Sequence, residues 1–101
     1  MAKKSKKQIS IIIETKSPSL INILPTKYLD SKLIGKELLK GNALVVDLKE
    51  MSKVESIRLI DFLTGVLFIT KGGFKEIASK TYLIAPSKEI LEKFLTQFKN
   101  V

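Results

Sequence analysis

Short apolar runs alternate with amphipathic helical patterns along this chain of 101 residues. Runs rich in β-branched or apolar residues predict strands at Gln8–Thr15, Leu20–Leu24, Ala43–Leu48, Val66–Thr70, Phe74–Ser79 and Tyr82–Ala85. Apolar residues spaced three and four apart predict helices after Asp30, Ser52 and Ser87. This order predicts an α+β or α/β sandwich, with a mixed sheet of about five strands, two helices packed on it and a C-terminal helix.

Local signals predict where the helices begin and end. Asp30 is a good N-cap for the first helix, and Ser52 with Glu55 forms a capping-box pattern for the second. Gly65 is predicted to end the second helix, so that the following apolar run becomes a strand. Gly35, inside the first helix, indicates a close contact between helix and sheet.

Charge divides the chain into a basic arm and a single domain. Residues 1–8 contain Lys3, Lys4, Lys6 and Lys7, and residues 9–101 are predicted to form the core domain. The net charge of +8 is explained equally well by solubility and by attraction to an acidic partner: an anionic membrane, an acidic peptide or a nucleic acid. Nucleic-acid sites usually use Arg, whereas Arg58 is the only arginine in the chain.

The composition excludes several kinds of chemistry. The chain contains no Cys and no His, so zinc sites and His-based catalytic triads are excluded, and no disulfide can form. No apolar run reaches the roughly 18 residues that a membrane span needs. The carboxylates are dispersed over predicted solvent-facing positions. We therefore expect a binding or assembly module that is not an enzyme and holds no cofactor or metal.

A longer motif resembles the core of the SepF family, bacterial cell-division proteins that link the FtsZ ring to the membrane. RLIDFLTG resembles the end of the family's second helix, with Arg58, Asp61, Phe62 and Gly65 matched. A Gly-Gly turn and YLIAP follow, with Tyr82 where the family usually has Phe. Upstream, KELLKGNALVVDL resembles the preceding helix and strand, so the resemblance covers roughly Leu20–Pro86.

This resemblance implies a homodimer that assembles into polymers and binds the C-terminal peptide of FtsZ. The implied peptide-binding residues are Tyr82, Lys75, Lys80, Ser56 and Phe74. The implied dimer and assembly residues are Arg58, Asp61, Phe62 and Gly65, and the spacing of Arg58 and Asp61 also allows a local ion pair. The implied location is the cytoplasm at the division site, or the stroma if the chain is plastid-derived.

Three features leave other interpretations open. Bacterial members usually begin with an amphipathic membrane-targeting helix, whereas this sequence begins MAKKSKKQ, whose lysines predict only weak contact with an anionic membrane. LVVDL and KGGF are also compatible with a nucleic-acid-binding sheet, although the stacking aromatics are missing. GNALVVDLKEM followed by a helix resembles a partner-switch regulatory domain that lacks its phosphorylation motif.

Overall fold

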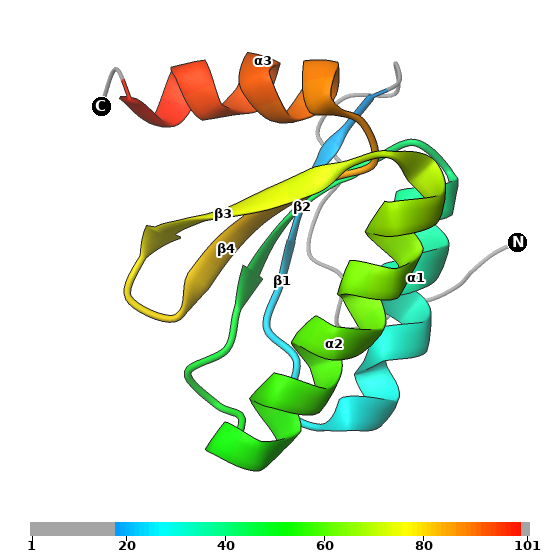
Figure 1. Ribbon diagram of the computed structural model, residues 1–101. Helices are drawn as coiled ribbons and strands as arrows, with labels where there is room; N and C mark the ends of the chain where they lie inside the picture. The colour runs from blue at the N-terminus through cyan, green and yellow to red at the C-terminus, as the bar shows by residue number, and fades with distance from the viewer. Residues whose placement is uncertain (1–17, 100–101) are drawn as a thin grey trace, which may run out of the picture.

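The computed structural model describes residues 18–99 as four strands, three α-helices and one short 3-10 helix (Figure 1). In chain order they are β1 (Leu20–Ile23), η1 (Tyr28–Asp30), α1 (Ser31–Leu39), β2 (Ala43–Asp47), α2 (Lys53–Thr70), β3 (Gly73–Ala78), β4 (Thr81–Ala85) and α3 (Lys88–Lys99). The strand predicted at Gln8–Thr15 and the lysines of the arm lie outside the described residues.

The strands form one mixed sheet in the order β1-β2-β4-β3. β1 and β2 are parallel and α1 is the crossover between them, whereas β4 lies antiparallel to both β2 and β3. The predicted mixed α and β architecture is confirmed, with four strands in the described part of the chain rather than about five.

Side chains of the strands alternate between two faces of the sheet, and helices cover both faces (Figure 1). α1 and α2 cover one face, over a core of Ile21, Ile23, Ile34, Leu38, Leu44, Val46, Leu48, Met51, Leu59, Leu63, Leu67 and Ile84. α3 covers the other face, where Leu91 and Phe94 pack with Ala43, Leu83 and Ala85. The central strands are therefore apolar on both sides, as the continuous run ALVV indicates.

The prediction that α2 ends at Gly65 and that Val66–Thr70 forms a strand was wrong. α2 continues to Thr70, and its last buried side chain is Leu67. Leu59, Leu63 and Leu67 lie four residues apart, so they form one stripe against the sheet. This packing outweighs the cost of about 1 kcal/mol that a glycine imposes inside a helix. It also outweighs the strand preference of Val66 and Ile69.

The turn after α2 depends on Gly72. Lys71 ends the helix in the left-handed conformation, with φ of 65°, and the Gly72 N–H donates to the Leu67 carbonyl at 3.0 Å. A Cβ atom at Gly72 would lie 2.1 Å from the carbonyl oxygen of Ala85. The chain therefore passes too close to β4 for any other residue at this position.

The two large apolar residues of β3 lie on opposite faces of the sheet. Phe74 pairs with Ile84 and faces α2, whereas Ile77 packs with the residues under α3. Because the two residues are three positions apart, the alternation of side chains along a strand accounts for this placement. A register shift between Glu76 and Ala78 then makes the end of β3 irregular.

Candidate functional site

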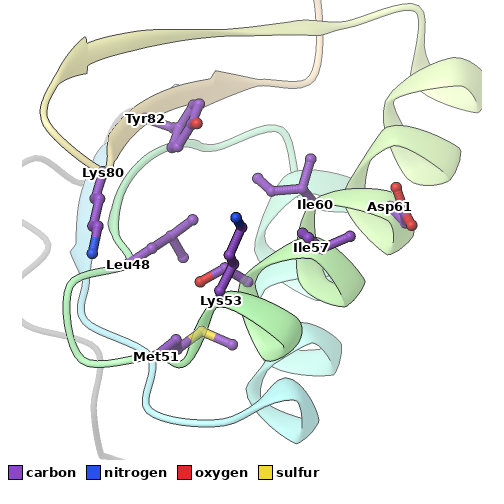
Figure 2. A pocket seen from close by; sticks show the side chains of 9 residues that line it. Leu48, Met51, Lys53, Ile57, Ile60, Asp61, Lys80 and Tyr82 are labelled. Atoms are coloured by element: carbon purple, nitrogen blue, oxygen red, sulfur yellow. The ribbon is translucent and has the colours of Figure 1, made fainter.

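A cavity of about 570 Å³ lies between α2 and the start of β4 (Figure 2). We call it the α2–β4 groove, and its lining residues are Leu48, Met51, Lys53, Ser56, Ile57, Ile60, Asp61, Lys80 and Tyr82. Figure 2 shows Lys80 and Tyr82 on one side, with Lys53, Ile57 and Ile60 opposite them on α2. The groove thus combines an apolar lining with two lysines from distant parts of the sequence.

The hairpin of β3 and β4 positions Tyr82. Tyr82 lies opposite Val46 in β2 and Glu76 in β3, and Val46 belongs to the core under α1 and α2, so Tyr82 points toward α2. The Phe74 ring lies 5.8 Å from the Tyr82 ring, at a tilt of 54°. Phe74 therefore supports the outer side of Tyr82 without lining the groove itself.

Lys80 lies in the turn between β3 and β4, in the left-handed conformation with φ of 57°. The Lys80 N–H donates to the Glu76 Oε2 at 3.2 Å, and the Lys80 carbonyl accepts a hydrogen bond of 2.7 Å from the Leu48 N–H. These bonds join the hairpin turn to the end of β2. The backbone from which the Lys80 amino group extends into the groove is therefore fixed.

The first turns of α2 supply the other side of the groove. The Ser52 Oγ accepts from the Glu55 N–H at 3.1 Å, which confirms the predicted N-cap. The reciprocal half of the capping box is replaced, because the Glu55 carboxylate accepts instead from the Tyr28 N–H. This bond holds the chain before α1 against α2, and the cap orients Lys53 and Ser56 toward the groove.

The structure brings together three of the five residues predicted for peptide binding: Tyr82, Lys80 and Ser56. Phe74 lies directly behind Tyr82. Lys75 is on the opposite face of the sheet, because it pairs with Leu83, which packs under α3. Sequence reasoning missed Lys53, although its spacing of four from Ile57 and seven from Ile60 places all three on one side of a helix.

The four residues predicted for assembly separate into two groups. The Arg58 guanidinium lies 4.3 Å from the centre of the Tyr28 ring, and the Phe62 ring meets that ring edge-on at 6.5 Å. Within residues 18–99 Arg58 makes this contact in place of the ion pair with Asp61. A Cβ at Gly35 would lie 3.2 Å from Phe62, so the close approach predicted for Gly35 is to a helix rather than to the sheet.

Gly65 instead faces outward on α2, and the exposed Asp61 lies between this outward side and the groove that it lines. Apart from the neighbouring backbone of the helix itself, no atom lies within 4 Å of where a Cβ of Gly65 would be, so the helix end predicted at Gly65 is an open position inside α2. Apolar side chains surround them: Phe68 is 83% exposed, Ile69 76%, Val54 67% and Ile57 53%. We call this surface the α2 outer face, and it comprises Val54, Ile57, Asp61, Gly65, Phe68 and Ile69. It adjoins the α2–β4 groove, because Ile57 and Asp61 also line that groove.

This geometry suits binding. The volume of the groove is sufficient for a few side chains of a peptide, and most of its lining is apolar. The amino groups of Lys53 and Lys80 come from opposite walls, and the groove is also lined by one carboxylate, that of Asp61. An occupant that places its carboxylates near the two lysines and an apolar anchor against the apolar lining would be complementary to it.

Comparison with known proteins assigns the family. The model of the family described as "Cell division protein SepF" matches residues 21–90. The chain belongs to the SepF family. The "Cell division protein SepF" of Nocardia farcinica (strain IFM 10152) is 32% identical over 68 residues, which are 67% of this chain and 24% of that protein. That of Mycobacterium sp. (strain KMS) is 28% identical over 83 residues, 80% of this chain and 38% of that protein.

The match to SepF includes α1, α2 and every residue that lines the α2–β4 groove. Most of α3 lies beyond it, so the covering of the second sheet face is a feature outside the matched segment. The chain aligns with well under half the length of these SepF relatives. Within residues 18–99, no helix has the length and apolar character needed to cross a bilayer.

Proposed function

We propose that this SepF-family chain is a non-enzymatic adaptor of cell division that binds the C-terminal tail of FtsZ in the α2–β4 groove. The observation that carries the proposal is the meeting of Tyr82, Lys80 and Ser56 in one groove of about 570 Å³. In this proposal an apolar side chain of the tail packs against Tyr82. The ammonium groups of Lys53 and Lys80 attract its acidic residues.

The proposal assigns different weights to these contacts. Aromatic anchors in partly closed pockets usually dominate peptide affinity, whereas exposed lysines mainly raise the association rate. Tyr82 is half-buried and supported by Phe74, so its ring is already held in place before a ligand arrives. Lys75 is not part of this contact, because it faces the opposite side of the sheet.

We further propose that two copies associate through the α2 outer face and that such dimers polymerise at the division site. Large exposed apolar side chains adjacent to one another commonly mark protein interfaces. Gly65 provides a stretch of bare backbone between Asp61 and Phe68, where a second helix can approach closely. The arm lysines Lys3, Lys4, Lys6 and Lys7 would add weak attraction to an anionic membrane and help to tether the ring.

Binding of a fluorescent FtsZ C-terminal peptide tests the groove. Tyr82→Ala should weaken binding about tenfold or more, because the anchor is lost, whereas Tyr82→Phe should stay close to wild type. Phe98→Ala is the matched aromatic control, since Phe98 belongs to α3 and packs on the other face of the sheet. Equal affinity of wild type and Tyr82→Ala, or no binding by wild type, would remove the proposal.

The lysines are tested by salt dependence. Replacing Lys53 and Lys80 by Gln should slow association and flatten its dependence on ionic strength. The matched control replaces Lys75 and Lys88, which changes net charge equally but lies away from the groove. If both pairs slow association equally, the effect is one of net charge and the groove lysines have no specific role.

A further inference from the structure

The outward side of α1 carries both lysines and exposed leucines. Lys32, Lys36 and Lys40 are exposed, and Leu29 and Leu39 are each 67% exposed. The spacing of Lys32, Lys36 and Leu39 places them on the side of α1 opposite the buried Ile34 and Leu38. Leu29 precedes this side in η1, and Lys40 follows it at the C-cap of α1. We call this surface the α1 outer face.

The charge of this surface is almost entirely positive. Neither Lys32 nor Lys36 forms an ion pair with another described residue. Lys40 lies 3.4 Å from Glu37, but that carboxylate is buried at the side of the helix and also accepts from the Asn42 amide. The carboxylate of Asp30 accepts from the N–H groups of Thr26 and Lys27 and so is engaged by the preceding turn.

The core does not explain the two leucines. Leu29 and Leu39 are absent from both apolar clusters of the structure, which are complete without them within the described residues. Leucines flanked by lysines on one side of a helix are the pattern of a surface that lies in a lipid headgroup layer. The apolar side chains enter the acyl boundary there, and the lysine ammonium groups reach the anionic headgroups.

We propose that the α1 outer face binds the surface of an anionic lipid bilayer, with α1 lying parallel to the membrane. A nucleic acid fits this surface less well, because the α1 outer face presents leucines in place of stacking aromatics and contains no arginine. The chain's single arginine lies over Tyr28.

This contact leaves the α2–β4 groove accessible. α1 packs against the flank of α2 that carries Phe62, whereas Ile57 and Ile60 line the groove on the opposite flank (Figure 1, Figure 2). A membrane-bound chain could therefore hold a peptide at the same time. The proposal does not depend on the identity of that peptide.

Flotation of the full chain with lipid vesicles tests the charges. Vesicles of phosphatidylglycerol and phosphatidylcholine in equal parts should bind wild type, and vesicles of phosphatidylcholine alone should bind it weakly. Lys32→Glu with Lys36→Glu should lower partitioning into the anionic vesicles at least about tenfold. The matched control, Lys88→Glu with Lys93→Glu on α3, changes net charge equally and should retain most binding.

A tryptophan probe tests the leucines. The chain contains no Trp, so Leu39→Trp introduces a single reporter that should shift to shorter wavelength on anionic vesicles and be quenched by brominated lipids. Phe68→Trp on the α2 outer face, at an apolar position that is even more exposed than Leu39, should not be quenched. Leu29→Ser with Leu39→Ser should reduce the fraction of binding that survives high salt.

Several outcomes would overturn the proposal. One is equal loss of vesicle binding in both charge variants, which would assign binding to net charge and the basic arm. Another is quenching of the probe at Phe68 but not at Leu39. A third is tighter binding to single-stranded RNA than to vesicles, lost in the α1 charge variant. Two further measurements on the α1 charge variant serve as controls, and both are expected to give wild-type values. Its thermal unfolding temperature detects a folding defect. Its affinity for the FtsZ peptide shows whether the α2–β4 groove works independently of membrane binding.

Discussion

The two sides of α2 have similar amino-acid types but different environments. On the inner side, Leu59, Leu63 and Leu67 are at most 5% exposed against the sheet. On the outer side, Phe68 and Ile69 are 83% and 76% exposed. A helix that is apolar all round is normally buried all round. The comparison therefore teaches that the inner side accounts for the packing of α2 on the sheet, whereas the packing within residues 18–99 does not account for the apolar outer side.

The first prediction contrasts two neighbouring residues on these sides. Leu67→Ala should lower the free energy of unfolding by about 3 kcal/mol, because a buried side chain is removed and leaves a cavity. Phe68→Ala should change it by less than about 0.5 kcal/mol at low protein concentration, because little is buried there. Urea denaturation of both variants measures the difference.

Self-association provides the second half of that contrast. By analytical ultracentrifugation, Phe68→Ala should weaken association of the chain, whereas wild-type association should be detectable at high concentration. A wild type that stays monomeric at high concentration, or a Phe68→Ala variant that associates as wild type does, would contradict the assignment of the α2 outer face to a second copy.

The second prediction concerns the turn that follows the C-terminus of α2. Gly72→Ala should lower the free energy of unfolding by about 2–3 kcal/mol, because the methyl group would collide with the backbone of Ala85 and Pro86. Gly73→Ala is the control, since its Cβ would meet only side-chain atoms, Leu91 Cδ2 at 3.2 Å being the nearest. A smaller loss for Gly72→Ala than for Gly73→Ala would show that the turn can relax.

Most of the fold could be predicted from local patterns, because β1, β2, β4 and the starts of α2 and α3 carry local signals. The Ser87 Oγ accepts from the Ile90 N–H at 3.2 Å, as its cap pattern predicts. The second half of α2 could not be predicted in this way, because a glycine followed by VLFIT locally favours a strand. Only the contact of Leu63 and Leu67 with the sheet decides for a helix.

The candidate site likewise has residues that could be predicted and placements that could not. Family resemblance indicated Tyr82, Lys80 and Ser56, and the fold places all three in one groove. It could not separate Lys75 from Lys80, because the face on which a strand residue lies depends on its register with β4. It also could not place Arg58 over Tyr28, since these residues are 30 positions apart in the sequence and meet only after α1 packs on α2.

The third prediction tests the start of the helix. Ser52→Ala should lower the free energy of unfolding by about 1 kcal/mol, because the Glu55 N–H loses its hydrogen-bond acceptor. Ser52→Asp keeps an acceptor and should remain close to wild type. Thermal or urea denaturation of the pair measures the cap, and an equal loss in both variants would point to a different role for the Ser52 hydroxyl.

The last and smallest predicted effect is that of Gly65→Ala, which should stabilise the fold and weaken association. Gly65→Ala should raise the free energy of unfolding by about 0.5–1 kcal/mol, because alanine favours a helix interior and a Cβ there meets no atom within 4 Å. If a second α2 packs closely over Gly65, the added methyl group should weaken association of the same variant. Gly35→Ala is the control, since its Cβ would press on Phe62 at 3.2 Å and so should gain less stability. A Gly65→Ala variant that is more stable and associates as strongly as wild type would exclude close helix contact at this position, and would leave Phe68 and Ile69 as the residues to which a partner must bind.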